Sequence, residues 1–339
     1  MKSSSQLNIA LLGLGRAGQF QLNSIRSMAG ATLRHAVDVN DQRATNIAAE
    51  FGCSHGTNPE AALADPEVNA VIVATPTGEH FGQIMAALKA GKAVFTEKPL
   101  GNGLEEIDEC FRLAAEKSLP LFVGFNRRFD PSFSSLASRV QAGDIGTPQF
   151  LRVTSRDSPL PSTDYIRTSH GIFHDCIVHD LDMIRFITRE DPIKVYSVGS
   201  NFVSEIKALD DLDNVLVTLT FASGLLASID VNRFAAYGYD QRIEAFGSKG
   251  MLQAENRSPI STVLATAEGL RRPPIEHSFP SRYREAYRRE LETFKDCVLV
   301  GTPVPITHED VRASFLLCDL AERSYREGQP MKCRLGPVE

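Results

Sequence analysis

Three features are missing from this sequence, and each absence excludes a class of protein. The six cysteines contain no C-x-x-C pair, which is the spacing of zinc ribbons and dithiol redox sites. No uncharged apolar run approaches transmembrane length, and Met1 to Gln6 reach the first strand without the apolar core of a leader peptide. No stripe of Lys and Arg is present and the net charge is −6, so the phosphate backbone of a nucleic acid is an unfavourable partner.

The rest of the composition is that of an ordinary globular protein. The chain has 339 residues, of which 42% are hydrophobic and 23% charged, and this is enough for two substantial cores. Scattered cysteines within apolar stretches are typical of reduced thiols in a cytosolic protein. We therefore expect a soluble, cytoplasmic protein of two domains, with no membrane or nucleic-acid partner.

The first 124 residues alternate short apolar runs with helical patterns. Runs rich in Val, Ile, Ala and Leu are typical of strands buried on both faces, and they occupy 8–12, 32–38, 70–74, 93–96 and 121–124. Helices are predicted at 17–28, 41–51, 79–90 and 104–116. The sequence therefore predicts an α/β fold whose first domain, residues 1–124, is a Rossmann-type doubly wound parallel sheet.

The pattern changes after residue 124. Strands are predicted at 149–155, 195–200, 214–221, 225–231, 241–246 and 250–253, and helices at 132–141, 281–299 and 309–326. Consecutive strands joined by short turns form antiparallel sheets, so residues 125–339 are predicted to be an α+β domain with an open, mainly antiparallel sheet. Thr307 and Asp310 resemble a capping box, and the loop 159–169 is expected to be a mobile lid.

A glycine motif, Gly13-Leu14-Gly15-Arg16-Ala17-Gly18, follows the first strand and opens a helix. A lone G-x-G-x-x-G is often accidental, but here the strand before it and the helix after it favour a dinucleotide site. Gly13 permits a tight turn, Gly15 lets the backbone approach a pyrophosphate, and Gly18 lets the helix pack closely. The phosphates are expected at the helix N-terminus, at Arg16 and Ala17.

Asp38 lies at the end of the second predicted strand, 20 residues after Gly18. A carboxylate there accepts hydrogen bonds from the adenosine ribose and repels a 2′-phosphate, which favours NAD over NADP. Arg43 follows five residues later. It is either a ligand for a 2′-phosphate or a solvated arginine on a helix.

Thr75-Pro76-Thr77 follows the strand 70–74, at the carboxyl edge where open α/β sheets bind ligands. Thr75 and Pro76 are therefore candidates for cofactor contact, although Thr77 is also a reasonable helix cap. His80 either faces the cofactor or sits in the first turn of the next helix.

Glu97-Lys98-Pro99 follows the strand 93–96 at the same edge. The apolar strand delivers Lys98 to the ligand side, where Pro99 fixes the backbone and Glu97 is able to hold the ammonium group. The alternative is an ordinary surface lysine.

A polar cluster near residue 175 has two interpretations. Asp175 and His179 share one face of a helix that starts near Asp175, and a carboxylate beside an imidazole is the equipment of a general base. His170 and His174 have the spacing of two metal ligands, but Gly171 between them makes a rigid helical pair doubtful, and no metal is predicted. Asp180 and Asp182 are expected to be helix-end and surface charges.

Together these motifs resemble the Gfo/Idh/MocA oxidoreductases, and within them the inositol 2-dehydrogenase branch. The resemblance spans residues 7–330 and rests on the glycine motif, Glu97-Lys98-Pro99, the run from Gly124 to Asp130, and Gly171-Ile172-Phe173-His174-Asp175 followed by His179-Asp180. It implies that Lys98, Asp175 and His179 are the catalytic trio beside the nicotinamide of NAD. It also implies a homotetramer joined through the open sheet of the second domain.

The resemblance further implies the residues that surround the substrate. Asn126, Arg127 and Asp157 are expected to approach the cofactor or the polyol, and Tyr237 to close over the substrate. His170 stands where smaller residues are common in the family, which indicates a different pocket wall.

The expected reaction is NAD-dependent oxidation of a secondary hydroxyl of a cyclic polyol, with myo-inositol as the first candidate. His179 removes the hydroxyl proton, Asp175 orients the imidazole, and Lys98 stabilises the developing alkoxide. The alternatives are a pyranose or aldose dehydrogenase, a dehydrogenase of another inositol isomer, and a non-catalytic NAD-dependent sensor on the same fold.

Overall fold

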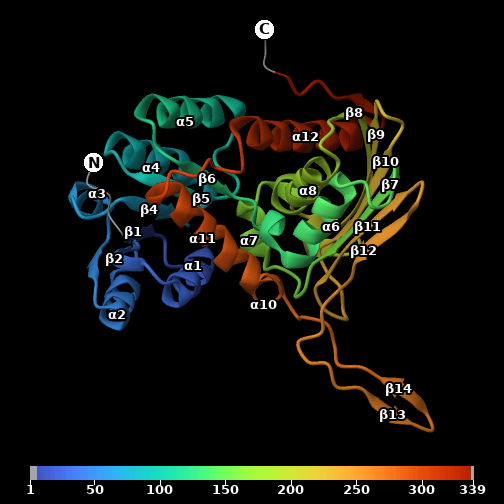
Figure 1. Cartoon of the computed structure of the whole chain (residues 1–339), viewed down its shortest axis with the longest axis horizontal. Helices are drawn as coiled ribbons and strands as arrows, with labels where there is room; N and C mark the ends of the chain where they lie inside the picture. The colour runs from blue at the N-terminus through green and yellow to red at the C-terminus, as the bar shows by residue number, and fades with distance from the viewer. Residues whose placement is uncertain (1–5, 337–339) are drawn as a thin grey trace. The chain divides into compact units, whose positions relative to one another are not determined.

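The computed structural model describes residues 6–336 and divides them into two compact units, whose elements are labelled in Figure 1. The first comprises residues 6–129 and Arg284–Arg312, and the second comprises Asp130–Tyr283 and residues 313–336. Residues 284–312, predicted to lie in the second domain, thus belong to the first unit. Residues 1–5, part of the segment predicted to lack a leader, lie outside the described residues.

The first unit contains a six-stranded sheet of order β3-β2-β1-β4-β5-β6, in which every neighbouring pair is parallel. The strands are β1 (Leu7–Leu12), β2 (Ala31–Val37), β3 (Ser54–Gly56), β4 (Ala70–Val73), β5 (Ala93–Glu97) and β6 (Leu121–Gly124). The helices are α1 (Arg16–Ser27), α2 (Asp41–Phe51), α3 (Glu60–Ala64), α4 (Thr77–Lys89), α5 (Leu104–Lys117) and the 3₁₀ helix η1 (Asn126–Phe129). This confirms the doubly wound sheet, and the strand order reverses between β1 and β4, where such sheets bind ligands.

Two short elements of this unit were not predicted. Strand β3 has three residues, two of them exposed, and helix α3 has five. Neither gives the apolar run or the helical period from which the longer elements were predicted.

Helix α11 (Arg284–Leu299) covers part of the first unit with aromatic side chains. Tyr287 stacks on Phe20 of α1 at 5.3 Å between ring centroids. Phe294 meets Phe95 of β5 and Phe122 of β6 at 5.8 and 6.0 Å. The single helix predicted at 281–299 is wrong in one respect, because α10 (Phe279–Arg282) ends before α11 begins and Tyr283 separates them.

The second unit contains a seven-stranded sheet of order β12-β11-β7-β10-β9-β8-β15. Its strands are β7 (Pro148–Arg156), β8 (Pro192–Ser200), β9 (Asn214–Phe221), β10 (Leu226–Asn232), β11 (Asp240–Gly247), β12 (Gly250–Ala254) and β15 (Met331–Lys332). All pairs are antiparallel except β7 with β10, which is parallel. The prediction of an open, mainly antiparallel sheet is confirmed.

The helical segments around this sheet include α6 (Pro131–Gln141), α7 (Thr163–Thr168), the π-helical turn η2 (Phe173–Ile177), α8 (Val178–Thr188), α9 (Ser204–Lys207) and α12 (His308–Glu327). Of these, α6 contacts β12, η2 contacts β10 and α8 contacts β7. Strand β9 alternates, with Val215, Val217 and Leu219 buried and Leu216 44% exposed. Apolar side chains are also exposed on the neighbouring strands, at Val198 and Leu226.

Three details bear on the predictions made for the later part of the chain. The capping box is confirmed, since the Thr307 amide donates to Asp310 at 3.1 Å and the Asp310 amide donates to the Thr307 hydroxyl at 3.2 Å. The segment 159–169 is not a plain loop, because it contains α7. A hairpin of β13 (Leu264–Thr266) and β14 (Gly269–Arg271), which was not predicted, extends away from the rest of the second unit (Figure 1). Within residues 6–336 no helix has the length and hydropathy needed to cross a membrane.

Candidate active site

The glycine motif forms the turn from β1 into α1. Gly13 has a φ of +88°, and a Cβ there would lie 2.6 Å from the Ala74 carbonyl oxygen. A Cβ on Gly18 would overlap the Gly13 carbonyl oxygen, whereas a Cβ on Gly15 would meet nothing within 4 Å. The first and third glycines are therefore required by packing, and the second leaves open space over the backbone at the start of the helix.

Asp38 holds the glycine turn from the end of β2. Its carboxylate is 7% exposed and accepts hydrogen bonds from the backbone amides of Leu14 at 2.8 Å and Asn40 at 2.9 Å. Burial alone would raise the pKa of Asp38, but these amides and the Arg43 guanidinium outweigh it and lower the pKa. Arg43 lies 3.2 Å from the carboxylate, so it is paired rather than merely solvated.

His80 joins two loops at the carboxyl edge of the sheet. One ring nitrogen lies 2.8 Å from the Thr75 carbonyl oxygen and the other 2.7 Å from that of Pro99. The Thr75 hydroxyl donates to Gln83 at 3.0 Å. Burial lowers the pKa of His80 and outweighs its hydrogen bonds to the two carbonyl groups. His80 is thus a buried bridge, and helix α4 begins at Thr77 without a side-chain cap, since its N-cap is Pro76.

Lys98 follows β5 at the same edge, and the Lys98–Pro99 peptide bond is cis. Glu97 at the end of β5 pairs in register with Gly124 at the end of the parallel strand β6. Lys98 and Asn126, which follow these two strands, therefore lie at the same carboxyl edge of the sheet. Asn126 and Arg127 are buried in η1. The structure therefore gathers Lys98, Asn126 and Arg127 at one end of the first sheet, where ligands bind in such folds.

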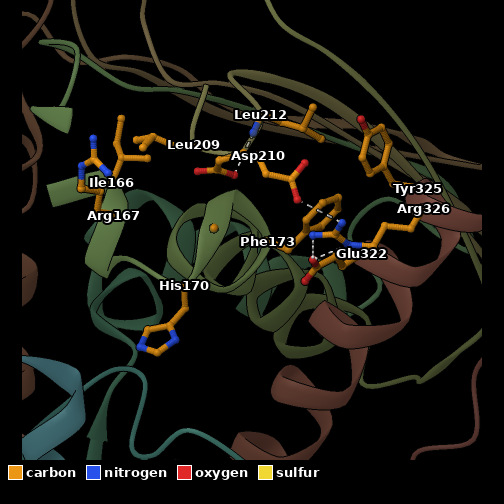
Figure 2. A pocket seen from close by; sticks show the side chains of 12 residues that line it. Ile166, Arg167, His170, Phe173, Leu209, Asp210, Leu212, Glu322, Tyr325 and Arg326 are labelled. Carbon is orange, nitrogen blue, oxygen red and sulfur yellow. Dashed lines mark hydrogen bonds and ion pairs between the residues drawn. The ribbon is translucent and has the colours of Figure 1, made fainter. Parts of the chain in front are cut away.

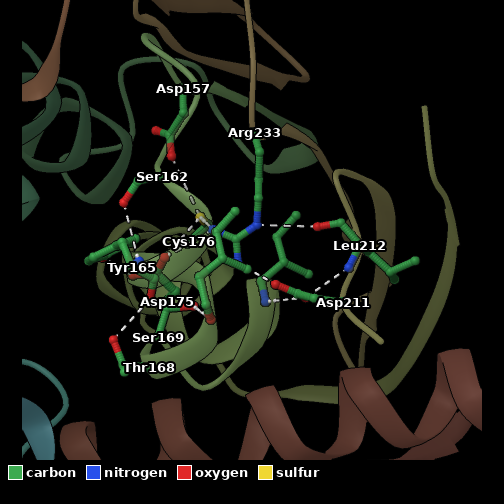
Figure 3. Close-up of polar contacts among 12 residues, drawn as sticks. Asp157, Ser162, Tyr165, Thr168, Ser169, Asp175, Cys176, Asp211, Leu212 and Arg233 are labelled. Carbon is green, nitrogen blue, oxygen red and sulfur yellow. Dashed lines mark hydrogen bonds and ion pairs between the residues drawn. The ribbon is translucent and has the colours of Figure 1, made fainter. Parts of the chain in front are cut away.

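Asp175, in the second unit, is held on both carboxylate oxygens (Figure 3). The Tyr165 hydroxyl donates to one oxygen at 2.8 Å, and the Arg233 guanidinium donates to the other at 3.1 Å. Arg233 has no exposed surface and also donates to Asp211 at 2.8 Å. These two donors, one of them a cation, fix the orientation of the Asp175 carboxylate.

The helix that carries Asp175 is not a regular α-helix. Asp175 lies in the π-helical turn η2, and His179 is the second residue of α8, which continues from it. Such single π-turns inside α-helices are frequently found at functional sites. The assignment of Asp180 and Asp182 to helix-end and surface charges is wrong, since both are fully buried.

Two predicted substrate residues lie in the second unit. Asp157 accepts a hydrogen bond from the Cys176 thiol at 3.7 Å, and the same sulfur lies 3.9 Å from the Asp175 carboxylate (Figure 3). The ring of Tyr237 is 53% exposed, and its hydroxyl donates to Asp240 at 2.5 Å and accepts from Arg156 at 3.1 Å. Tyr237 therefore belongs to a polar network of its own.

The two histidines considered as metal ligands are separated by the structure. His174 lies 3.0 Å from Asp319, whereas His170 has a φ of +63° and lines a pocket of about 540 Å³ (Figure 2). Residues 6–336 contain no group of three or more His, Cys, Asp and Glu arranged to hold a metal ion. The pocket is lined by residues on α7, η2 and α12, before η2 and between α9 and β9: Ile166, Arg167, Gly171, Phe173, Leu209, Asp210, Asp211, Leu212, Glu322, Tyr325 and Arg326.

Sequence reasoning missed two residues that fix Asp175. Tyr165 lies in the segment predicted as a loop, and Arg233 follows β10, 58 residues from Asp175. The sequence gives little indication of this role for Arg233. It is a single arginine after β10, a strand in which buried residues alternate with more exposed ones.

The first unit fits a bound NAD. The first-turn amides of α1 lack acceptors within the helix, no acidic side chain stands in that turn, and the space over Gly15 is open. An ionised carboxylate, Asp38, lies beside the glycine turn. Gly13 to Gly18 would hold the pyrophosphate and Asp38 the ribose hydroxyls.

Comparison with known proteins agrees with this geometry. Residues 7–125 match the oxidoreductase family with an NAD-binding Rossmann fold, and residues 133–253 match the GFO/IDH/MocA C-terminal domain. The chain is 39% identical to the inositol 2-dehydrogenase of Rhizobium meliloti over 322 residues, which cover 95% of this chain and 97% of that protein. It is also 39% identical to the myo-inositol 2-dehydrogenase of Thermotoga maritima over 328 residues, which cover 96% of this chain and 98% of that protein.

A solved structure extends the comparison to the fold. The scyllo-inositol dehydrogenase of Lactobacillus casei, with NAD(H) and scyllo-inositol bound, has a TM-score of 0.90 and is 28% identical. The alignment covers 96% of this chain and 99% of that chain. The protein described here therefore belongs to the Gfo/Idh/MocA family of NAD-binding oxidoreductases.

Proposed function

We propose that this protein is an NAD-dependent inositol 2-dehydrogenase that oxidises myo-inositol to 2-keto-myo-inositol (scyllo-inosose). The observation that carries the proposal is the fixed Asp175 carboxylate, one helical turn before His179, in a chain that also holds an NAD-type glycine turn. The relatives named above act on inositols, which supports this substrate class.

The proposed roles follow from the chemistry of each side chain. When bound, NAD would supply the acceptor for the hydride that leaves the oxidised carbon. His179 accepts the proton of the hydroxyl group on that carbon, and the negative charge of Asp175 stabilises the imidazolium. Lys98 donates a hydrogen bond to the same oxygen and stabilises its developing negative charge.

Specificity for a polyol needs several donors and acceptors, because each hydroxyl must be matched. We assign this role to Asn126, Arg127, Asp157 and Tyr237. The Tyr237 hydroxyl is hydrogen-bonded to Asp240 and Arg156. The proposal therefore requires this hydroxyl to give up those hydrogen bonds when it binds the substrate.

Substrate identity is tested by following NADH formation with myo-inositol, scyllo-inositol, D-chiro-inositol and D-glucose, each with NAD and with NADP. We expect turnover on an inositol and a preference for NAD, because Asp38 repels a 2′-phosphate. Activity only on glucose would replace the inositol assignment by a pyranose dehydrogenase. Tight NAD binding without turnover on any polyol would favour a sensor.

The catalytic roles are tested by Lys98→Ala and His179→Ala. Each is expected to lower kcat by roughly a hundredfold or more, because a general base or a charge-stabilising donor is lost, while NAD affinity is largely retained. Lys89→Ala and His55→Ala, which remove an exposed lysine and an exposed histidine, serve as controls. Near wild-type kcat in either site variant would remove that residue from the mechanism.

The same proposal includes the setting of the enzyme. A homotetramer formed through the outer face of the second sheet would cover Val198, Leu216 and Leu226, which are apolar and exposed. The six free thiols suit a reducing compartment, and we place the enzyme in the cytoplasm, in inositol catabolism.

A further inference from the structure

Helix α11 carries a glutamate in the middle of its buried stripe. The stripe consists of Ala286, Tyr287, Glu290, Leu291, Phe294 and Cys297. Glu290 has no exposed surface, and neither of its carboxyl oxygens has a hydrogen-bond partner among residues 6–336. An ionised carboxylate in such a place is very unfavourable, so a buried carboxyl without a cation takes up a proton.

Two further polar side chains of the same unit belong to this region, since the charge of Glu97 acts on Glu290 and helix α1, which carries Gln21, packs against α11. Gln21 of α1 is also fully buried, and its amide nitrogen donates to the carboxylate of Glu97 at 2.8 Å. The amide oxygen of Gln21 has no donor among the described residues. The cluster Gln21–Glu97–Glu290 therefore has three acceptor atoms in need of a donor, and the proton of a carboxylic acid is the donor it lacks.

The electrostatics agree with the geometry. Burial, reinforced by the negative charge of Glu97, raises the pKa of Glu290 well above its usual range. Burial also raises the pKa of Glu97, against the hydrogen bond from Gln21 and the positive charge of Lys98. Two carboxyl groups that interact in this way share one proton.

The charged groups on the elements around Glu290 can be named. Helix α11 packs against α1, η1 and β1. Helix α1 carries Arg16 and Arg26, the second of which is paired with Glu50. Helix η1 contributes Arg127 and Arg128, and Arg128 lies 3.1 Å from Asp310. Strand β1 has no titratable side chain. The positive charge of Lys98, the next residue in the chain, lowers the pKa of Glu97, and within the described part of the chain no cation acts in this way on Glu290. Glu290 is therefore the carboxyl group of the cluster that we assign the proton.

We propose that Glu290 is a buried neutral acid whose proton completes the hydrogen bonds of Gln21 and Glu97, and that this cluster positions Lys98. Glu290 is a positioning residue and touches neither substrate nor cofactor. The positioning role of Glu290 depends on the catalytic role proposed for Lys98. The protonation of Glu290 does not depend on that role.

Protonation is tested by infrared spectroscopy of the whole protein at pH 8 without substrate. The spectrum of Glu290→Gln is expected to lack one carbonyl band of a protonated carboxylic acid that the wild type shows. Glu285→Gln, an exposed glutamate of the same helix, is the control and is expected to leave that band intact. Equal intensity of the band in the wild type and Glu290→Gln would overturn the proposal.

Thermal unfolding gives a second measurement. A carboxyl whose pKa is higher in the folded than in the unfolded state stabilises the fold below about pH 4.3, and this contribution is lost as the pH rises. The Tm of Glu290→Gln minus that of the wild type is therefore expected to increase from pH 4.5 to pH 8. A difference that does not change with pH would show that Glu290 ionises normally.

Positioning is tested by comparing Glu290→Gln with Glu290→Met. The amide keeps a donor and should retain kcat within about threefold of wild type, whereas the thioether removes the donor and should lower kcat at least tenfold with little change in the KM for NAD. Equal kcat in both variants would contradict a role toward Lys98. If Glu290→Met does not fold, a kcat of Glu290→Gln below one-tenth of wild type would contradict that role instead. If the wild type oxidises none of the polyols, the proposed function is wrong. The infrared test of Glu290 protonation would still be valid, because it does not depend on activity.

Discussion

Arg233 has no exposed surface, and its guanidinium group forms ion pairs with two carboxylates of the second unit. It donates to Asp175 and Asp211, and its Nε donates to the Leu212 carbonyl oxygen at 3.2 Å. A planar fork of this kind satisfies several acceptors at once, which a lysine cannot do. The orientation of Asp175, which lies in η2, therefore depends on Arg233, which follows strand β10.

Replacing Arg233 by Met should destabilise the protein strongly. The substitution leaves Asp175 and Asp211 buried without their cation, a loss of about 3–5 kcal/mol for the free energy of unfolding. Urea unfolding measures this loss, and kcat is expected to fall with it. Arg323→Met, which removes an exposed ion pair on α12, should change the free energy by less than about 0.5 kcal/mol. Equal effects of the two substitutions would contradict the account.

Residues near one another in the sequence were predictable at this site, and residues brought together by the fold were not. Asp175 and His179 are four residues apart, so helical spacing was enough to group them. Arg233 reaches Asp175 through the packing of η2 against β10, which no local pattern specifies. Asp180 and Asp182 were misjudged for the same reason, since their burial depends on tertiary packing.

At the scale of elements, two glycines in the turn between β1 and α1 have different roles. Gly18 is needed for packing, and Gly15 is expected to be needed for binding NAD. Gly18→Ala should lower the free energy of unfolding by about 1–3 kcal/mol, because its Cβ overlaps the backbone of Gly13. Gly15→Ala should leave the Tm of the protein without cofactor unchanged, because its Cβ meets open space, and should weaken NAD binding. Thermal unfolding with and without NAD distinguishes the two.

The result for Gly15 decides where the pyrophosphate lies. Unchanged NAD affinity in Gly15→Ala would place the pyrophosphate away from this turn. A lowered Tm of the same variant without cofactor would instead show that the space over Gly15 is filled by the protein.

Long elements with a regular period were predicted correctly, and short or polar ones were not. The longer strands of the first sheet are rich in apolar residues, which made them predictable from the sequence. Strand β3 and helix α3 are too short to show a period. Helix α11 was predicted from its apolar positions, but its membership of the first unit depends on the contacts of Tyr287 and Phe294, which the sequence does not reveal.

At the scale of the whole molecule, the outer face of the second sheet is the surface proposed to join subunits. Val198 and Leu216 are neighbours in the β8–β9 register and both are exposed. Leu216→Asp would place a charge at the centre of such an interface, which is costly when buried. We expect light scattering to show a tetramer for the wild type and smaller species for Leu216→Asp.

A substitution outside the sheet serves as the control for assembly. Val300 is 74% exposed and lies after α11 in the first unit, so Val300→Asp should keep the mass of the wild type. A Leu216→Asp protein with the same mass as the wild type would exclude this face as the interface.

The return of residues 284–312 to the first unit has a consequence for synthesis on the ribosome. When residues 6–129 have emerged, the aromatic side chains of Phe20, Phe95 and Phe122 still lack the partners that α11 supplies. Domains generally fold in the order of their synthesis, but here the earliest segment cannot be completed until nearly the whole chain has been translated. The nascent NAD-binding unit must therefore wait, with apolar surface exposed, through the translation of the entire segment from Asp130 to Tyr283.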